Sequence, residues 1–298
     1  MKPGPFAYHA PDTLDEAVAL LGELGDEAKV IAGGQSLMPL LAMRLAAPAH
    51  LVDVGRIAAL HGHERRNGTL TVGAATRDAV LERDADVATA VPLLARATPF
   101  IGHFQIRNRG TVGGSLAHAD PAAEYPAVAL ALDAQLDVVS ARGTRTVPAG
   151  EFFQGVWTTS LDADEVLAAV HLPVWEGRCG FAVQEFARRH GDFAVAGAVA
   201  AVRLNDDGAV DRCAIALFGL GSTPLRARTA ERALLGARST ERTAEEVGQL
   251  AMTDVHEPPD DLHAPAKYRL RVGAAMVAAA WSRALDEAMK SGQEAGNA

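Results

Sequence analysis

The residues best suited to chemistry in this sequence are glycines rather than acids, bases or nucleophiles. Residues 30–40 read VIAGGQSLMPL, where an apolar run leads into Gly33 and Gly34 and is followed by Gln35 and Ser36. Glycine reaches positive φ and lets the backbone approach a ligand closely. Successive N–H groups in such a turn form a concave anion site, and Ser36 can donate one more hydrogen bond. The pattern is typical of a phosphate-binding turn, and also of a purely structural turn between a strand and a helix.

A second glycine-rich segment, residues 107–134, reads RNRGTVGGSLAHADPAAEYPAVALALDA and lies about 80 residues further along the chain. We expect its glycines to expose polar backbone; they are Gly110, Gly113 and Gly114. Side-chain donors lie close to them at Thr111, Ser115 and His118. Two such turns in one chain favour a ligand site more than one turn does.

The helix predicted within this segment is PAAEYPAVALAL, with one acid just before it and one in its first turn. Asp120 and Pro121 fit the N-cap and the first helical position, which makes Asp120 a structural residue. Glu124 is expected about one turn into the helix. It could accept a hydrogen bond from a sugar or polyol hydroxyl, or it could be a solvated acid of the first turn.

A third polar cluster, EFARRHGDFAVAG, covers residues 185–197. Arg188, Arg189 and Asp192 have the composition of an ordinary charged turn. Phe193 lies between this turn and an apolar strand, so it either joins the core or covers a flat ring.

Other catalytic motifs are absent or incomplete. FGLGSTP at residues 218–224 has G-x-G after a strand, but Pro224 replaces the third glycine of the dinucleotide fingerprint. The sequence has no G-K-[ST] of a P-loop and no G-x-S-x-G nucleophile elbow. His61, His63 and Glu64 lack zinc-ligand spacing and indicate a surface loop.

Length and composition describe a folded protein, with two domains expected for 298 residues. The net charge of −9 disfavours nucleic acid or an anionic membrane as a partner. Two cysteines, Cys179 and Cys213, are too few to hold an iron–sulfur cluster and are expected to be free thiols. No signal peptide or membrane span is evident, so the cytoplasm is the expected location.

The elements that position these residues can be predicted from periodicity. Residues 13–57 indicate helix, strand, helix and strand, with Thr13 and Glu16 as a capping box and the glycine turn after the strand KVIA. From about residue 58 the pattern becomes α+β, with strands at TLTVGAATR and EVLAAVHLP, a helix at ATAVPLLARAT and a hairpin with Gly143 near its turn.

A domain boundary is expected near residue 176. Beyond it, AVAAVRLNDDGAVDRCAIALFGL predicts a hairpin that turns at residues 205–208. Helices are expected from about Ala230, after Thr243 with Glu246 as a capping box, and from about Pro265 to Met289.

Taken together, the three segments resemble the FAD-binding medium subunit of molybdenum hydroxylases, the group of carbon monoxide dehydrogenase and xanthine dehydrogenase. The motifs that carry this resemblance are VIAGGQSLMPLL with MRL, IRNRGTVGGSLAHADPAAE and EFARRHGDFA, in this order and spacing. The C-terminal AKYRLRVGAAMVAAAWSRAL is similar to the last helix of that family. The resemblance extends along nearly the whole chain.

The resemblance implies an α+β fold in two domains. A FAD-binding domain of the vanillyl-alcohol-oxidase (PCMH) type would span residues 1–176, with α/β subdomains at about 1–57 and 58–176. A small α+β domain with an antiparallel sheet and helices would follow at 177–290, and residues 291–298 would form a tail.

The resemblance also implies which residues bind FAD. One side of the pyrophosphate site would be lined by Lys29, Val30, Ala32, Gly33, Gly34, Gln35, Ser36 and Leu37. The other side would be lined by Thr111, Gly114, Ser115 and His118. Further contacts would be Glu124 with ribitol or ribose hydroxyls, Ile101 and Gly102 near the flavin ring, Leu167 on the adenine or flavin, and Phe193 near the ring. Some relatives carry a lysine at the position of Glu185, so no role is carried over to that residue.

The implied activity is electron transfer, with no catalytic side chain and no metal ligand in this chain. A large partner with molybdopterin would oxidise the substrate, and a small partner with [2Fe–2S] clusters would pass electrons to the FAD held here, for delivery to an external acceptor. The complex would be a dimer of heterotrimers. The alternatives are a stand-alone FAD-dependent oxidoreductase and a non-catalytic nucleotide-binding module.

Overall fold

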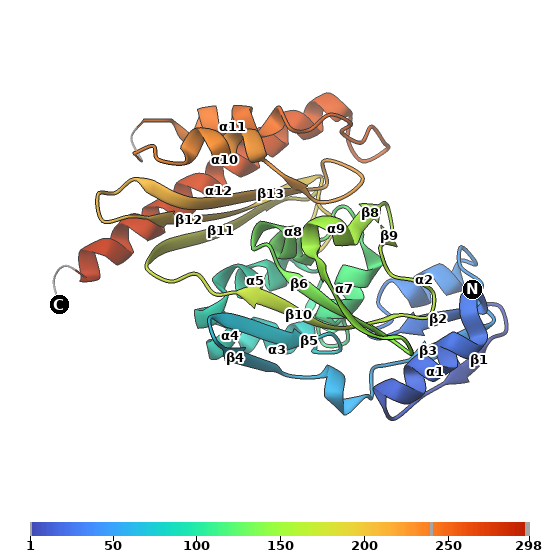
Figure 1. Ribbon diagram of the computed structural model, residues 1–298. Coiled ribbons are helices and arrows are strands. Elements are labelled where there is room, and N and C mark those ends of the chain that lie inside the picture. Colours follow the sequence, from blue (N-terminus) through green and yellow to red (C-terminus); the bar gives the residue numbers. More distant parts are fainter. Residues whose placement is uncertain (1, 239–240, 296–298) are drawn as a thin grey trace.

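The computed structural model describes residues 2–238 and 241–295, without the side chains of residues 292–295. In this range the chain builds three main sheets and a short two-stranded ribbon. Helices pack against each main sheet (Figure 1). The first sheet is parallel and the next two are antiparallel, which confirms the predicted α+β class.

The N-terminal part is a three-stranded parallel sheet in the order β1-β3-β2. Its elements are β1 (Ala7–His9), α1 (Leu14–Leu24), β2 (Ala28–Ile31), α2 (Leu37–Ala42) and β3 (His50–Asp53). Helix α1 buries Ala17 and Leu21. Of the two hydrogen bonds of the predicted capping box, one is present, from the Glu16 N–H to Thr13 Oγ1 at 3.2 Å. The other is not, because the Glu16 carboxylate accepts from the N–H of Asp12 rather than that of Thr13.

The middle part is a five-stranded antiparallel sheet in the order β4-β5-β10-β6-β7. Its strands are β4 (His63–Arg66), β5 (Thr69–Gly73), β6 (Gln135–Ser140), β7 (Gly143–Pro148) and β10 (Val166–Pro173), and β8 (Phe153–Gly155) and β9 (Thr158–Thr159) form the ribbon. The predicted β6–β7 hairpin is confirmed, with Gly143 at φ +117° at its turn.

Seven helices connect the strands of this middle part. They are α3 (Asp78–Arg83), α4 (Ala85–Ala90), α5 (Pro92–Ala97), α6 (Phe104–Arg107), α7 (Val112–His118), α8 (Glu124–Ala131) and α9 (Ala149–Phe152). The stretch ATAVPLLARAT was predicted as one helix but forms parts of two. The reason is Pro92, which pushes Val91 out of the helical region to φ −136° and ψ 77°.

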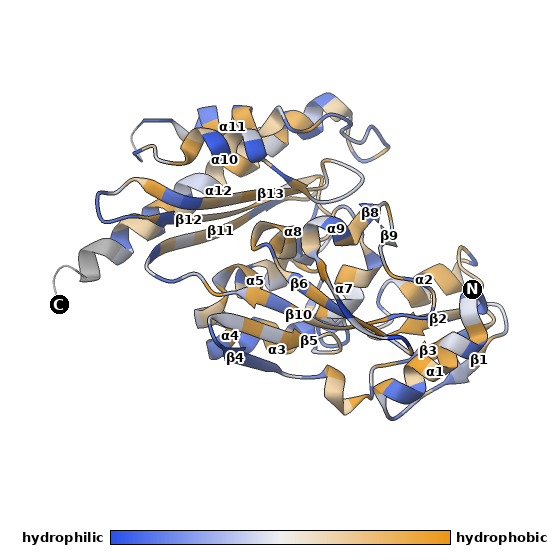
Figure 2. Ribbon diagram, in the orientation of Figure 1, coloured by the Kyte–Doolittle hydropathy of each residue, from blue (hydrophilic) through white to orange (hydrophobic). Residues whose placement is uncertain are grey.

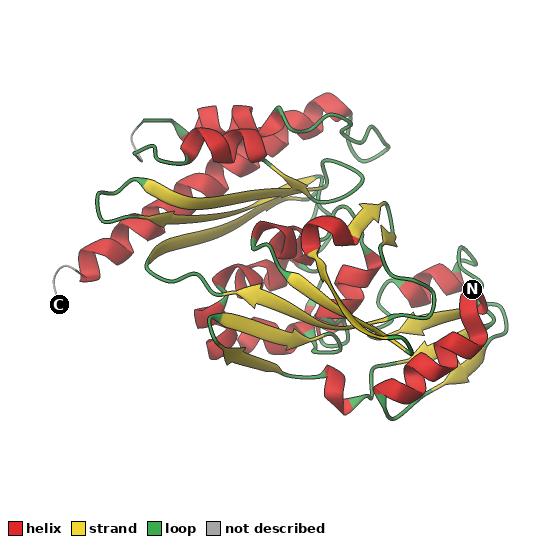
Figure 3. Cartoon of the chain, in the orientation of Figure 1, coloured by secondary structure: helices red, strands yellow, loops and turns green. Residues whose placement is uncertain are grey.

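The C-terminal part is a four-stranded antiparallel sheet in the order β11-β12-β13-β14. Its elements are β11 (Arg178–Phe186), β12 (Ala196–Leu204), β13 (Val210–Phe218), β14 (Leu225–Arg226), α10 (Arg228–Leu234), α11 (Ala244–Met252) and α12 (Ala266–Ala295). Figure 3 shows the three helices together on one side of this sheet. The β12–β13 hairpin and the Thr243–Glu246 capping box are confirmed.

The last helix is longer than predicted. Helix α12 continues past Met289 to Ala295, so residues 291–295 of the predicted tail are helical. Residues 296–298 of that tail lie outside the described residues. None of the helices in the described ranges is long and apolar enough to cross a membrane.

The C-terminal sheet is buried on both faces. Along β11, Phe181 and Val183 pack into the core shared with the middle part, whereas Ala182 packs into the core beneath α12. Figure 2 shows hydrophobic residues along β11, β12 and β13 and a hydrophilic β4. Strand alternation therefore assigns alternate residues of β11 to opposite cores.

Polar contacts join the C-terminal part to the middle part. The Arg96 guanidinium on α5 donates to both carboxylate oxygens of Glu287 on α12, at 2.6 and 2.7 Å. Glu287 Oε2, the oxygen at 2.6 Å, also accepts from the Phe181 N–H at 3.0 Å. The Gly219 N–H donates to the Pro121 carbonyl at 2.7 Å, so the segment before α8 is attached to the end of β13.

Gly180 provides a test of this packing. A Cβ there would overlap the Ala284 carbonyl oxygen and lie 2.7 Å from the Ala288 nitrogen. We expect Gly180→Ala to lower the free energy of unfolding by about 3 kcal/mol, because α12 must move off β11. Gly150→Ala is the control, since its Cβ would meet nothing closer than Leu130 at 4.0 Å. Equal urea midpoints for the two variants would contradict the packing.

Candidate cofactor site

The two glycine segments predicted from the sequence meet in space. A Cβ at Gly33 would overlap the Arg109 carbonyl oxygen and lie 2.9 Å from the Gly110 Cα. A Cβ at Gly114 would lie 3.9 Å from the Cβ of Ala32. The turn after β2 and the segment leading into α7 therefore form one continuous backbone surface, at the carboxyl end of a parallel strand, where α/β layers commonly bind ligands.

The first turn presents a run of free donors. Among the described residues, none accepts a hydrogen bond from the backbone N–H groups of residues 33–37. Two carbonyls of the same turn do accept hydrogen bonds. The Gly34 carbonyl accepts from the Met38 N–H at 3.0 Å, and the Gly33 carbonyl accepts from Gln35 Nε2 at 2.8 Å. Gly34 has φ +71°. Because backbone donors are normally paired, consecutive free N–H groups are the arrangement that binds an anion.

The second segment differs from its prediction. The Gly113 N–H donates to the Ala74 carbonyl at 2.9 Å, and the Gly114 N–H donates to Thr111 Oγ1 at 3.1 Å. Gly110 and Gly113 are buried rather than exposed, so that expectation is wrong. They are glycines because of close packing: a Cβ at Gly113 would lie 2.7 Å from the Ala74 carbonyl oxygen.

The second segment can contact a ligand through polar side chains rather than through free N–H groups. Thr111 is buried as the N-cap of α7, while Ser115 and His118 are half-buried on that helix. Burial lowers the pKa of His118, and the charge of Lys29 lowers it further. Lys29 lies on β2 and His118 on α7, so the two charges belong to the two predicted sides of the site.

The predicted roles of Asp120 and Pro121 are wrong. Helix α8 begins at Glu124, and Ala123 is its N-cap residue. Asp120 instead closes a turn, in which its carboxylate accepts from the Ala122 N–H at 2.9 Å. The cause is tertiary, because the Gly219 N–H bonds to Pro121 and attaches this segment to the C-terminal sheet.

The interpretation of Glu124 as a solvated acid of the first turn is wrong, because the residue is buried. It is 8% exposed at the first position of α8. Burial raises its pKa well above the usual range, and the charge of Glu185 on β11 raises it further. Burial raises the pKa of Glu185 to about 7 as well.

Sequence reasoning missed Asp78, another buried acid. It is 2% exposed at the start of α3, and its Oδ1 has no hydrogen-bond partner. Burial raises its pKa to about 7. A Cβ at Gly110 would overlap Asp78 Oδ2, so this acid lies directly behind the second glycine segment. No feature of the sequence around residue 78 marks it.

The residues predicted to lie near a flat ring are spread over two loops. Ile101 and Gly102 are half-buried, and their carbonyls accept from the Arg107 guanidinium at 3.2 and 3.1 Å. Phe193 is 68% exposed, which rules out its assignment to the core and leaves its ring free to cover a ligand. Leu167 is 6% exposed within the core of the middle part.

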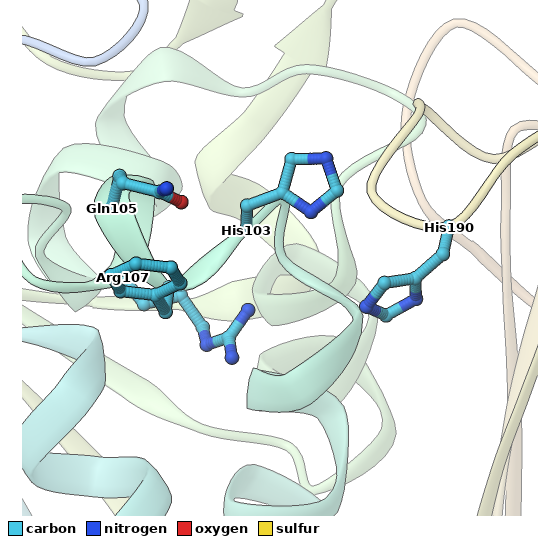
Figure 4. A pocket seen from close by; sticks show the side chains of 5 residues that line it. His103, Gln105, Arg107 and His190 are labelled. Atoms are coloured by element: carbon cyan, nitrogen blue, oxygen red, sulfur yellow. The ribbon is translucent and has the colours of Figure 1, made fainter.

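A cavity of about 300 Å³ lies beside these loops and is lined by His103, Phe104, Gln105, Arg107 and His190. Figure 4 shows His103 and His190 reaching it from different segments of the chain. Their ring centroids are 5.8 Å apart. A Cβ at Gly191 would lie 2.8 Å from the His103 ring, so this loop of the C-terminal part touches the loop before α6.

These features fit a dinucleotide with a flat ring, and FAD in particular. The free N–H groups match a diphosphate, the buried carboxyl of Glu124 matches a polyol, and the exposed ring of Phe193 matches an isoalloxazine. Within the described ranges, no group of three or more histidine, cysteine or acidic side chains is placed to hold a metal ion.

Comparisons with known families agree with this geometry. The FAD binding domain in molybdopterin dehydrogenase matches residues 4–175. The CO dehydrogenase flavoprotein C-terminal domain matches residues 181–284.

Individual proteins are similar over nearly their whole length. The chain is 39% identical to the 6-hydroxypseudooxynicotine dehydrogenase complex subunit alpha of Paenarthrobacter nicotinovorans, over 97% of each chain. It is 38% identical to the carbon monoxide dehydrogenase medium chain of Hydrogenophaga pseudoflava, over 95% of this chain and 99% of that one.

Solved structures have the same fold. Carbon monoxide dehydrogenase from Hydrogenophaga pseudoflava superposes with a TM-score of 0.92 at 39% identity, over 96% of this chain and 99% of that chain. Quinoline 2-oxidoreductase from Pseudomonas putida 86 superposes with a TM-score of 0.91 at 36% identity, over 97% of this chain and 100% of that chain.

The burial of Asp78 predicts a pH-dependent stability. Its pKa rises from 3.8 unfolded to about 7 folded, so the carboxyl lowers stability progressively as pH rises through that window. Asp78→Asn removes the charge. We expect its free energy of unfolding, relative to wild type, to increase between pH 4 and pH 7 by at most about 4 kcal/mol, and then to level off.

Asp207→Asn in the exposed β12–β13 turn is the matched control. Urea unfolding at several pH values measures both variants. A difference between Asp78→Asn and wild type that stays constant from pH 4 to pH 8 would show that folding does not raise the pKa of Asp78.

Proposed function

The chain belongs to the family of FAD-binding medium subunits of molybdenum hydroxylases, and on that premise we propose that it binds FAD and passes electrons from [2Fe–2S] clusters of a partner subunit to an external acceptor. It is the flavoprotein subunit of a molybdenum-containing oxidoreductase. The observation that carries the proposal is the run of free backbone N–H groups at residues 33–37, beside the second glycine segment.

In the proposed site, the diphosphate lies on the free N–H groups of the first turn. The hydroxyls of Ser36 and Ser115 add donors from the two sides, and the charge of Lys29 attracts the anion. Residues 30–37 supply the turn itself, and Thr111, Gly114 and His118 border it from α7. These assignments rest on the contact between the two segments.

The rest of the cofactor extends toward the C-terminal part. Glu124, buried at the start of α8, accepts from ribitol or ribose hydroxyls. Ile101 and Gly102 border the ring, and the exposed Phe193 covers it. FAD supplies the conversion between one-electron and two-electron transfer when it is bound. Leu167 is buried in the core of the middle part. Its contact with the adenine or the flavin stays a prediction.

The proposed domain division is 1–176 and 177–290. It is supported by the family matches, which end at residue 175 and begin at residue 181. Glu185 and Phe193 lie in the second of these domains, so both domains contribute to the cofactor site. Two free thiols, Cys179 and Cys213, support the predicted cytoplasmic location.

The proposed partners are a large molybdopterin subunit and a small [2Fe–2S] subunit, assembled as a dimer of heterotrimers. The names of the relatives support this, since one is a complex subunit and another a medium chain. Exposed apolar side chains near α2 also support a partner contact, with Met43 48% and Leu45 71% exposed.

One observation favours the alternative of a stand-alone FAD-dependent oxidoreductase. His103 and His190 line a cavity beside the proposed ring position, and imidazoles are common acid–base groups. A non-catalytic nucleotide-binding module would instead bind nucleotide without redox activity.

Purification of the native protein separates these functions. We expect a large and a small chain to co-elute with it, with flavin and iron–sulfur absorption bands. A yellow chain that elutes alone and oxidises its own substrate would favour the stand-alone enzyme. A chain that binds FAD but is not reduced by any electron donor would favour the nucleotide-binding module.

A substitution at Gly34 tests the diphosphate assignment most directly. Gly34 has φ +71°, and a Cβ there would lie 3.2 Å from Met38 and 3.3 Å from Ile31. A β-branched residue opposes this φ and obstructs the N–H groups. We expect Gly34→Val to lose FAD, measured as flavin absorbance per folded chain after gel filtration.

Gly208→Val is the matched control. Gly208 has φ +78° in the β12–β13 turn with nothing within 4 Å, so the variant carries the same backbone strain away from the site. It should lose stability and keep its flavin. Full flavin content in Gly34→Val would refute the diphosphate assignment.

A further inference from the structure

A buried arginine near the start of α12 joins three segments of the C-terminal part. Arg269 Nη1 donates to the Val195 carbonyl just before β12 at 2.7 Å and to the Gly219 carbonyl just after β13 at 3.1 Å. Its Nη2 donates to both carboxylate oxygens of Asp261, at 2.9 and 2.8 Å. The planar fork of the guanidinium makes these contacts at the same time, which a compact ammonium group does not.

Val195 is also the base of the loop that connects β11 to β12, residues 187–194, here called the β11–β12 loop. The Val195 N–H donates to the Phe186 carbonyl at 2.8 Å and so closes the loop. The Phe186 ring lies edge-on to the Tyr268 ring, with centroids 6.2 Å apart. Tyr268 and Arg269 are consecutive residues of α12. They therefore contact the two sides of the loop base, at Phe186 and at Val195.

The tip of the β11–β12 loop rests on the middle part of the chain. A Cβ at Gly191 would lie 2.8 Å from the His103 ring. Phe193 lies midway in the sequence between this contact and the contact of Val195 with α12. The Phe193 side chain is exposed, whereas Ala194 and Val195 are buried. The exposed ring is therefore the part of the loop that lies between two held points.

The loop base is also connected to the segment that presents Glu124. The Gly219 N–H donates to the Pro121 carbonyl at 2.7 Å, while the Gly219 carbonyl accepts from Arg269. Pro121 precedes α8, which begins at Glu124. Arg269 therefore holds the loop base in a fixed position relative to the middle part.

The charged side chains of the loop do not hold it in place. Arg188 and Arg189 are exposed. In the part of the chain that the structure describes, neither of them forms an ion pair, and Asp192 forms none either. The position of the loop therefore depends on its contacts at the tip and at the base.

An aromatic ring contributes to binding a flat ligand only when it is held at the right distance and angle. Resting on the proposed function, we propose that Arg269 is a positioning residue, which holds the β11–β12 loop through the Val195 carbonyl so that the Phe193 ring lies against the isoalloxazine of FAD. Arg269 is buried, so it acts on the cofactor through this loop.

The test compares the full wild-type chain with Arg269→Lys. Lysine keeps the positive charge beside Asp261 but loses the planar fork that reaches both carbonyls. We expect the dissociation constant for FAD to rise about tenfold, the size of one aromatic contact. The visible circular dichroism of the bound flavin should change toward that of Phe193→Ala, because the ring beside the flavin moves away.

Arg226→Lys is the matched control. The side chain of Arg226 on β14 is 6% exposed and that of Arg269 is 5% exposed. Arg226 also donates to both oxygens of one carboxylate, Glu231, at 2.6 and 3.0 Å, and to the Leu130 carbonyl at 3.0 Å. Its partners lie outside the β11–β12 loop, so Arg226→Lys should lose stability but keep the wild-type flavin spectrum and FAD affinity.

A double variant distinguishes positioning of the ring from general support of the fold. Phe193→Ala removes the ring, so Arg269→Lys should not weaken FAD binding further in that background. If Arg269 only supports the fold, the two losses of affinity add. Should Arg269→Lys not fold, Asp261→Asn takes its place, because it weakens the hold on the guanidinium from an exposed residue.

Trypsin provides a measurement without FAD. Arg188 and Arg189 are exposed cleavage sites within the β11–β12 loop. In the cofactor-free chain, Arg269→Lys should be cut at these sites several times faster than wild type, because a loop released at its base opens more often. Arg226→Lys should be cut there at the wild-type rate.

The outcomes are distinct. Additive losses in the double variant, or unchanged FAD affinity and flavin spectrum in Arg269→Lys, would overturn the proposal. Equal rates of trypsin cleavage in Arg269→Lys and wild type would overturn it as well. If the wild-type chain does not bind FAD at all, the proposed function fails, and the trypsin result alone then decides whether Arg269 holds the loop.

Discussion

The contact between the backbone at Gly33 and the backbone at Arg109 and Gly110 is the constraint on which the site depends. No side chain larger than hydrogen fits between them. This contact fixes the turn after β2, with its free N–H groups at residues 33–37, against the segment that leads into α7. Without it, the two glycine segments would be separate turns on separate subdomains.

Local signals predicted the first segment well. The apolar strand, the paired glycines and the polar pair that follows are a local pattern, and Gly34 has the positive φ that the pattern predicts. The same reasoning gave the β6–β7 and β12–β13 hairpins, because their turn residues decide the conformation within a few positions.

Features set by distant contacts were not predictable in this way. Gly113 is glycine because Ala74 packs against it, which no neighbouring residue indicates. Helix α8 begins at Glu124 rather than near Pro121 because Gly219, about 100 residues later, bonds to the Pro121 carbonyl.

The division of labour in the molecule follows from these contacts. The turn after β2 offers free backbone N–H groups and α7 offers polar side chains, while the C-terminal part adds the exposed ring of Phe193. None of these groups needs to react with a substrate. In the proposed site they hold FAD and leave the chemistry to the cofactor, as expected for a flavoprotein subunit.

The most direct measurement is amide hydrogen exchange of the full chain with and without FAD. If the free N–H groups hold the diphosphate, the amides of residues 33–37 should exchange quickly in the cofactor-free chain and become strongly protected when FAD is added. Protection elsewhere, with these amides unchanged, would contradict the proposed site even if FAD binds.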